Sequence, residues 1–361
     1  MKKILFICPY PEGIAAGQRL KFEPHFPAFR NAGYEITTHS FMNMKLWNIA
    51  SIKGRTFQKI FWTLIGLLRR IYLIFSIKQY DCIYIHMNVF PFGPPILERI
   101  YLLFAKKVIF DLEDNIFTKE LGSVNWLASI LKSKSKIAYL VTESDQVICS
   151  SPDLQKTCSE ISKKNNVTFI PPTLEASRFK PKDKRHSKQK EITIGWTGTF
   201  SSKNFLNQIL PELENLYKKK KFKLMVIGNF EMENKNLNLE VVQWNAKDEI
   251  DQLHCFDIGI YPLPENDWIS GKSGLKALQY MAIGIPPVCT AAGNVLNFID
   301  HGKDGILIYN NSEWVDSLAD LISDKKRRLE IGSKARVKFL SDFSQEAICK
   351  KYLSVIGDKI K

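Results

Sequence analysis

Short runs of apolar residues alternate along this chain with longer segments in which apolar positions recur every three or four residues. The runs are rich in β-branched residues and have the length of strands. They cover residues 4–8, 82–86, 108–111, 147–150 and 167–170 in the first half, and 192–196, 224–228, 240–242, 258–261, 287–290 and 306–308 in the second. Because most are apolar throughout, they predict parallel strands that are buried on both faces.

The segments between these runs have helical periodicity, most clearly at 123–139, 204–219, 313–323 and 325–340. Strand and helix therefore alternate through both halves, which predicts an α/β fold of two doubly wound, Rossmann-like domains. A stretch rich in proline and charge, from Pro171 to Lys190, separates the halves. We accordingly expect a first domain over 1–178 and a second over 190–343.

Each half opens with a strand followed by a glycine-containing turn and a helix. The first turn holds Gly13 and Gly17, and the second holds Gly198. Two lobes of this kind are expected to present the carboxyl ends of their strands to a shared cleft. Neither turn matches G-x-G-x-x-G or the P-loop pattern, so a nicotinamide or NTPase site is disfavoured.

Charge is unevenly distributed. The formal net charge is +14, and no acidic residue occurs between Glu35 and Asp81. That interval combines lysines and arginines with apolar stretches at 60–68 and 71–75, which Arg69 and Arg70 separate. Each part is shorter than a membrane span, so residues 45–78 predict a helix lying on an anionic membrane surface. The alternative is a buried helix with basic ends.

Other classes of protein are disfavoured by what the sequence lacks. It has no zinc-finger spacing, RNA-binding sheet motif or basic region with heptads, so we expect no nucleic-acid partner. Its seven cysteines are scattered and form no C-x-x-C pair, which argues for a reducing compartment and against a metal site. The first apolar run is too short for a signal peptide, so a cytoplasmic protein is expected.

The segment 271–286 carries the sharpest chemical signal. Ser273 is a candidate N-cap, residues 275–283 have helical periodicity, and Gly284 suits a helix end. A glycine-containing loop that enters a helix directs backbone N–H groups at one point and favours a phosphate there, where Lys272 adds a charge. The alternative is a well-capped core helix with solvated lysines.

This segment resembles the donor-binding signature of GT-B glycosyltransferases of the retaining family 4. Residues 279–286 align with the family's Glu-Ala-Met-Ala-x-Gly-x-Pro run. Two glutamates eight positions apart are replaced by Gly271 and Gln279. Residues 268–282, Trp-Ile-Ser-Gly-Lys-Ser-Gly-Leu-Lys-Ala-Leu-Gln-Tyr-Met-Ala, are similar to a bacterial surface-polysaccharide branch, so the replacement is interpreted as marking a subgroup.

Further segments along most of the chain resemble the same branch. The similar segments are 9–11, 18–22, 110–114, 144–151 and 194–199. The resemblance implies retaining, metal-independent, hexosyltransferase-type transfer from a nucleotide diphosphate sugar, with no cofactor. It also implies that a final helix, 344–361, packs back on the first domain.

The resemblance also implies roles for individual residues. The departing diphosphate would be held by the N–H groups of Ser273, Gly274 and Leu275, with Lys203 and Lys272 as cations. We expect Gln279 to bind the ribose. The remaining donor-site candidates are Gly13, Gly198, Thr199 and Trp244.

Candidates in the first domain follow its strands. His86 ends a strand and is the third catalytic candidate beside Lys203 and Lys272; the alternative is a structural histidine. Asp111, Glu113 and Asp114 are acceptor candidates, with a helix N-cap cluster as the alternative. Arg19 is a further acceptor candidate.

The sequence therefore predicts a glycosyltransferase of surface-polysaccharide biosynthesis, peripheral on the inner face of a bacterial membrane. Its acceptor is expected to be a glycan, lipid-linked by analogy with the family. Two rivals stay open. One is a sugar-nucleotide epimerase or phosphorylase on the same fold, and the other is a non-catalytic subunit that binds a sugar nucleotide.

Overall fold

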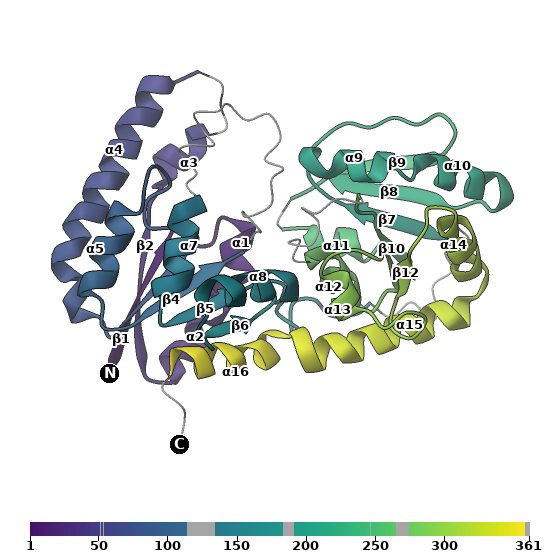
Figure 1. Ribbon diagram of the computed structural model, residues 1–361. Helices are drawn as coiled ribbons and strands as arrows, with labels where there is room; N and C mark the ends of the chain where they lie inside the picture. The colour runs from purple at the N-terminus through teal and green to yellow at the C-terminus, as the bar shows by residue number, and fades with distance from the viewer. Residues whose placement is uncertain are drawn as a thin grey trace. The chain divides into compact units, whose positions relative to one another are not determined.

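The computed structural model describes residues 1–50, 52, 54–113, 134–182, 191–245, 247–264 and 274–357. The chain folds into two compact units that divide between Pro172 and Thr173. The last helix is shared, because residues up to Ala347 belong to the second unit and Ile348 begins a return to the first. Figure 1 shows a parallel sheet with helices around it in each unit.

The first unit is built on a six-stranded parallel sheet with the order β2-β1-β3-β4-β5-β6. Its strands are β1 (Lys2–Cys8), β2 (Tyr34–Ser40), β3 (Cys82–His86), β4 (Val108–Leu112), β5 (Gln146–Cys149) and β6 (Val167–Phe169). Its helices are α1 (Ala16–Arg19), η1 (Glu23–His25), α2 (Phe26–Asn31), α3 (Met44–Ala50), α4 (Thr56–Leu73), η2 (Ile74–Gln79), α5 (Ile96–Phe104), α7 (Lys134–Glu143) and α8 (Pro152–Ser162).

Alternate residues of β1 enter two separate cores. Leu5 and Ile7 pack in a core that includes residues of η2, α5, α7 and α8. Ile4 and Phe6 pack on the opposite face, in a core that α2 and the end of α16 (Gln345–Ile356) complete. This is the two-faced burial expected of apolar parallel strands.

The second unit contains a six-stranded parallel sheet with the order β12-β11-β10-β7-β8-β9. Its strands are β7 (Thr193–Thr197), β8 (Lys223–Gly228), β9 (Asn238–Gln243), β10 (Ile258–Tyr261), β11 (Pro287–Thr290) and β12 (Ile306–Ile308). Its helices are η3 (Phe200–Ser202), α9 (Lys203–Asn207), α10 (Leu210–Lys219), α11 (Glu249–Leu253), α12 (Leu275–Ala282), α13 (Val295–Phe298), α14 (Glu313–Ser323), α15 (Lys325–Lys338) and the π-helical turn η5 (Phe339–Phe343). In both sheets the order changes direction beside the first strand, which is the switch point typical of ligand-binding α/β domains.

Several local predictions need correction. The helix expected over 204–219 is two helices, because Pro211 lies in the first turn of α10 and has no N–H to continue α9. Strand β2 was not predicted; it is an edge strand whose residues are only partly buried. Arg69 and Arg70 do not interrupt the apolar stretch, since α4 runs through both of them.

One helical run within the described residues, Thr56–Gln79, is long and apolar enough to cross a membrane by length and composition. Its mean hydropathy is 1.7 and 22% of its most apolar window is buried. Gly66 packs against Phe41, and Arg70 is fully buried. The opposite face leaves Phe57, Tyr72 and Phe75 from 79% to 90% exposed.

Candidate functional site

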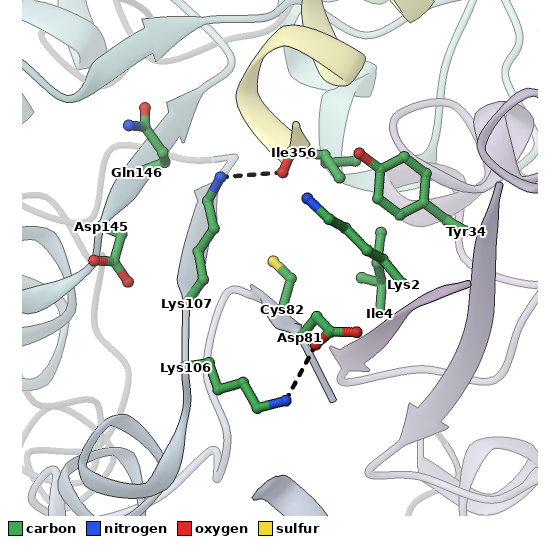
Figure 2. A pocket seen from close by; sticks show the side chains of 10 residues that line it. All are labelled: Lys2, Ile4, Tyr34, Asp81, Cys82, Lys106, Lys107, Asp145, Gln146 and Ile356. Carbon is green, nitrogen blue, oxygen red and sulfur yellow. Dashed lines mark hydrogen bonds and ion pairs between the residues drawn. The ribbon is translucent and has the colours of Figure 1, made fainter. Parts of the chain in front are cut away.

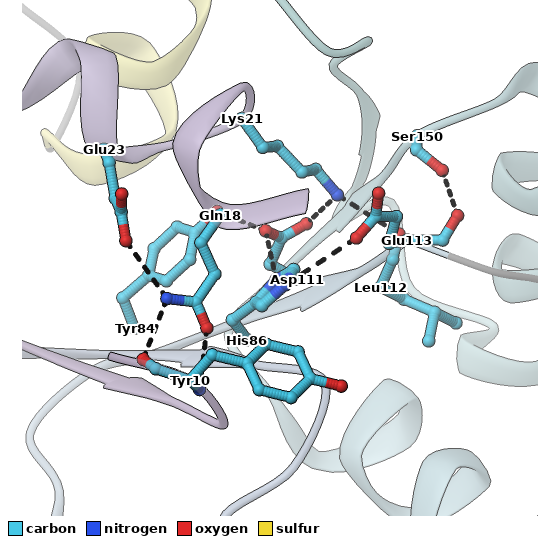
Figure 3. Close-up of polar contacts among 10 residues, drawn as sticks. All are labelled: Tyr10, Gln18, Lys21, Glu23, Tyr84, His86, Asp111, Leu112, Glu113 and Ser150. Carbon is cyan, nitrogen blue, oxygen red and sulfur yellow. Dashed lines mark hydrogen bonds and ion pairs between the residues drawn. The ribbon is translucent and has the colours of Figure 1, made fainter. Parts of the chain in front are cut away.

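The carboxyl ends of β3 and β4 bring two predicted site residues together. His86 ends β3 and is the register partner of Asp111 on β4. His86 Nδ1 lies 3.0 Å from Asp111 Oδ2, and His86 Nε2 lies 3.8 Å from Glu113 Oε2 (Figure 3). His86 and Asp111 are buried, while the Glu113 side chain is 27% exposed. The edge therefore presents one imidazole between two carboxylates.

A lysine that the sequence did not single out completes this cluster. Lys21 Nζ forms an ion pair with Asp111 Oδ1 and donates a hydrogen bond of 3.4 Å to the Leu112 carbonyl. The Tyr84 hydroxyl donates to Asp111 Oδ2 at 2.7 Å. Burial alone would raise the pKa of Asp111, but Lys21 and His86 outweigh it and lower that pKa to about 2. Asp111 is therefore ionised at neutral pH.

The turn after β1 is held by its own side chains. Gln18 accepts from the Tyr10 N–H at 2.9 Å and donates to the Tyr10 carbonyl at 3.0 Å. Glu23 accepts from Gln18 and, at 2.9 Å, from the N–H of Gly13, whose φ is +77°. The Gly13 N–H, expected at the donor site, is thus engaged within the turn. Of the acceptor candidates, Arg19 is half-buried and Asp114 lies outside the described residues.

The loop that follows His86 is also restrained. Met87 has a φ of +67°, and the Asn88 N–H donates to the His86 carbonyl at 2.8 Å. A hydrogen bond across one residue with this φ defines the rarer, strained form of γ-turn. Buried Glu98 accepts from the Val89 and Phe90 N–H groups, each at 3.2 Å. These contacts fix the backbone directly beyond the imidazole.

At the carboxyl end of β7, small side chains allow close packing. A Cβ on Gly198 would lie 2.2 Å from the Trp196 ring, so glycine is required there. Thr199 and Ser202 form a capping box at the start of η3. Lys203 Nζ donates to the Glu231 carbonyl at 2.8 Å and lies 5.3 Å from the Phe230 ring centre. The Lys203 ammonium is thus placed at this edge, already with one protein partner.

Helix α12 begins at Leu275, so its N-cap is Gly274 and not the predicted Ser273. Gly274 has a φ of +73°. Ser273 and Lys272 lie outside the described residues. Lys276 Nζ lies 4.8 Å from the Trp196 ring centre and 5.2 Å from that of Tyr261. The Lys276 ammonium, in the first turn of the helix, therefore lies against aromatic rings at the ends of β7 and β10.

Gln279, expected at the ribose, is 6% exposed and donates to Glu249 Oε1 at 3.2 Å. Glu249 is also buried, and its Oε2 lies 3.5 Å from Arg178. A carboxylate thus lies beside the amide that replaces the family glutamate. Trp244 follows β9, is 38% exposed and donates its backbone N–H to Gly228.

A cavity of about 560 Å³ lies at the opposite, amino-terminal edge of the first sheet. Three lysines line it beside Asp81 and Asp145, and Lys107 donates to the Ile356 carbonyl at the end of α16 (Figure 2). Lys107 also donates to the Val355 carbonyl. Lys106 is paired with Asp81. These contacts fasten the last helix and hold none of the predicted site residues.

Among the described residues, no group of three or more histidine, cysteine or acidic side chains could hold a metal ion. The six cysteines that are buried behave as small apolar residues, and Cys255 is exposed.

Comparison with known proteins identifies the fold. The family model described as "Glycosyl transferases group 1" matches residues 191–324. The D-inositol 3-phosphate glycosyltransferase of Corynebacterium jeikeium is 37% identical over 84 residues, which are 22% of this chain and 20% of that protein. The N-acetyl-alpha-D-glucosaminyl L-malate synthase of Bacillus anthracis is 26% identical over 131 residues, 35% of this chain and 33% of that protein. The matches thus span a fifth to a third of the curated relatives' length.

Solved structures match across both units. The sucrose-phosphate synthase of Thermosynechococcus elongatus superposes with a TM-score of 0.72 at 13% identity, over 99% of this chain and 98% of that one. Anabaena HepE, solved with UDP and glucose, gives 0.65 at 14% identity over 99% of both chains. The chain has the GT-B fold of glycosyltransferases, and residues 191–324 in its second unit match the group 1 glycosyl transferase model.

Proposed function

We propose that this protein transfers a sugar from a nucleotide diphosphate sugar to a hydroxyl of a glycan acceptor. The observation that carries the proposal is the group 1 domain at 191–324 within a chain that has the GT-B fold along its length. The fold alone hosts more than one activity, so the argument rests on the chemistry of each sheet edge.

The second unit supplies the donor half of the proposal. Its sheet edge carries Lys203 after β7 and Lys276 at the start of α12, where the helix dipole is positive. Cations and N–H groups aimed at a departing diphosphate stabilise the charge that develops as the sugar bond breaks. Lys272 and Ser273 are proposed for the same diphosphate. This arrangement supports metal-independent transfer, and a retaining outcome is proposed with it.

The ribose half of the donor is assigned to Gln279 together with Glu249. Their hydrogen bond leaves the Gln279 carbonyl oxygen as an acceptor for a ribose hydroxyl, while Glu249 Oε2 is paired with Arg178. HepE has been solved with UDP-glucose, which makes this the first donor to test. Trp244 is proposed beside the base.

The first unit is proposed to take the acceptor. We assign Glu113, whose side chain is 27% exposed, and the buried His86 beside it to a sugar hydroxyl, and Arg19 and Asp114 are kept as acceptor candidates. Asp111 is different, because it is fully buried and both of its oxygens are engaged by Lys21, His86 and Tyr84.

Membrane association is proposed for the apolar surface of α4, η2 and α5, which we call the α4–α5 surface. Its most exposed apolar side chains are Phe57, Ile60, Phe61, Leu64, Leu68, Tyr72, Phe75, Ile96 and Leu103. Lys59, Arg69 and Lys78 are basic residues of α4 and η2, and residues 56–79 include no acidic residue. Apolar side chains with lysines and arginines suit an anionic bilayer surface. We accordingly propose a lipid-linked acceptor, at the inner face of a bacterial membrane, in polysaccharide biosynthesis.

Vesicle binding tests the membrane proposal. Replacing Phe57, Leu68 and Phe75 with serine is expected to release the protein from phosphatidylglycerol vesicles in a sedimentation assay, because about 25 cal/mol is lost for each Å² of apolar surface no longer buried. Leu329 and Val337, which are exposed on α15, provide a matched control when changed to serine. Equal binding of the triple variant and the wild type would exclude this surface.

Donor turnover tests the transfer itself and separates it from its rivals. The purified protein is incubated with UDP-glucose and other nucleotide sugars, with and without a membrane lipid extract, and the products are separated. A transferase releases nucleoside diphosphate and labels the extract. An epimerase gives an isomerised sugar nucleotide without the extract. Thermal stabilisation by a nucleotide sugar without any turnover would indicate a non-catalytic subunit.

A further inference from the structure

The ion pair between Lys21 and Asp111, next to His86, is almost completely buried. Lys21 and Asp111 are 1% and 0% exposed, and each comes from a different segment of the first unit. Taking two charges out of water is costly, and an apolar pair of similar size is often as stable or more so. The pair therefore calls for an explanation besides stability, and its position one hydrogen bond from His86 suggests one.

The ionised carboxylate decides which nitrogen of His86 carries the proton. An ionised carboxylate only accepts hydrogen bonds, and Asp111 Oδ2 lies 3.0 Å from His86 Nδ1. Nδ1 must therefore be the protonated nitrogen. In a neutral imidazole this leaves Nε2 with a lone pair, facing the partly exposed Glu113 (Figure 3).

The ring is also held against rotation and displacement. Phe22 packs edge-on against it with the ring centres 5.2 Å apart. On the other side the strained turn at Met87 fixes the backbone that follows His86. Strain of this kind persists only where surrounding contacts over-determine the conformation, and it is concentrated at functional sites.

We propose that Lys21 and Asp111 are positioning residues that hold His86 as the Nδ1–H tautomer, so that Nε2 accepts a hydrogen bond from a hydroxyl of the acceptor sugar. Lys21 keeps Asp111 ionised, and Asp111 orients the imidazole. Neither residue touches the sugar. Only the role in kcat depends on the proposed sugar transfer; the tautomer of His86 does not.

The same geometry specifies the chemistry of the ligand at this edge. Nε2 and the Glu113 carboxylate both present acceptor atoms, which suit a neutral hydroxyl and oppose a phosphate. Gly17 leaves room for Glu113, since a Cβ at that position would lie 2.3 Å from Glu113 Oε2. The first-unit edge is therefore assigned to sugar hydroxyls, and the diphosphate to the second unit.

Nuclear magnetic resonance of ¹⁵N-histidine tests the tautomer without any substrate. The protein has six histidines, and the His86→Gln variant identifies the signal. We expect the neutral imidazole of the wild type to carry its proton on Nδ1. In Asp111→Asn the single amide oxygen cannot serve Lys21, Tyr84 and His86 together, so the signal should change toward the Nε2–H form. A wild-type Nε2–H form, or protonation of both nitrogens, would overturn the proposal.

Kinetics supply the second readout, once a donor is found. Asp111→Asn should lower kcat by roughly 10²–10⁴-fold, the range for losing an oriented histidine, with KM changed by less than about threefold. Tyr101→Phe removes a buried tyrosine hydrogen bond outside this cluster, the one to the Arg70 carbonyl, and should keep kcat within about threefold. A folded Asp111→Asn protein with unchanged kcat would overturn the proposal.

A double variant distinguishes loss of the positioning role from loss of folding. Lys21→Met combined with Asp111→Leu replaces the ion pair by an apolar pair and should remain folded by thermal melting. We expect this variant to lose the Nδ1–H form and the same share of kcat as Asp111→Asn. Retention of both would overturn the proposal. If the wild type transfers no sugar at all, the proposed function fails, while the tautomer measurement still decides the positioning role.

Discussion

Arg70 offers a quantitative test of how α4 is fixed to the first unit. Its guanidinium is fully buried and donates to three backbone carbonyls, those of Cys8 at 2.8 Å, His39 at 2.8 Å and Val89 at 3.0 Å. Cys8 is the last residue of β1, His39 is the second-last residue of β2, and Val89 lies in the loop after β3. One side chain therefore ties the helix of the α4–α5 surface to the edge that carries His86.

The expected cost follows from these contacts. A hydrogen bond to a charged group contributes about 1.5–3 kcal/mol, so three of them contribute about 5–9 kcal/mol before the cost of burying the charge. That burial cost is real, because desolvation lowers the pKa of Arg70 to about 10. We therefore expect Arg70→Met to lower the free energy of unfolding by about 3–5 kcal/mol. Arg70→Lys should lose somewhat less, because it keeps the charge but not the planar fork.

Urea unfolding followed by circular dichroism measures this loss, with Arg69→Met at the half-buried neighbouring position as the control. A second readout is independent of stability. Burial and then Arg70 lower the pKa of His39 to about 3, so removing the guanidinium should raise that pKa toward 6.5. A loss below about 1 kcal/mol together with an unchanged His39 titration would refute this account of Arg70.

Three further changes test packing elsewhere. His25 is buried with no hydrogen bond to either ring nitrogen, and desolvation lowers its pKa to about 3. Below pH 6.5 the unfolded state therefore binds one more proton at His25 than the folded state does. For each unit of falling pH, His25 lowers the free energy of unfolding by up to about 1.4 kcal/mol. His25→Phe should abolish this part of the pH dependence, as measured by melting curves at pH 7 and 5. Gly195→Ala places a Cβ 2.0 Å from the buried Phe256 ring, so urea titration should show a loss of about 1–3 kcal/mol or more. Lys107→Met removes two hydrogen bonds to the end of α16 and should cost about 1 kcal/mol, measurable as faster hydrogen exchange in that helix.

Apolar patterning was sufficient to predict the architecture. Strands such as β3 and β8 are continuous apolar runs, and the structure places each within a parallel sheet. The missed strand β2 shows where the signal fails. Its sequence, YEITTHS, has one aliphatic residue, because an edge strand needs little apolar surface and is held mainly by its hydrogen bonds to β1.

The candidate site was harder to predict for a different reason. His86 and Asp111 could be found because each follows or ends an apolar strand. Lys21 could not, since a lysine ordinarily indicates a solvent-exposed residue, and its burial depends on a carboxylate 90 positions away. The only signal was its place in the segment 18–22, which resembles other proteins of the branch. Long-range charge pairing leaves no periodic pattern.

Helix α4 illustrates how one residue can reverse an expectation. Arg69 and Arg70 were expected to interrupt the apolar stretch, because a charged pair is unfavourable in an apolar helix. Arg70 instead points into the unit, where carbonyls receive its guanidinium, and the exposed face of the helix stays apolar. Tertiary contacts determine which way the Arg70 side chain points, and these contacts cannot be predicted from the sequence of the helix alone.

Sugar transfer from a nucleotide diphosphate donor can be measured as the incorporation of labelled sugar into an acceptor. UDP-[¹⁴C]glucose and a panel of other labelled nucleotide sugars are incubated with the protein and a bacterial membrane lipid extract, beside a Lys203→Ala variant. The account predicts that one donor labels the extract with matching release of nucleoside diphosphate, and that Lys203→Ala loses most of this incorporation. No incorporation from any donor, or conversion of the donor without an acceptor, would contradict it.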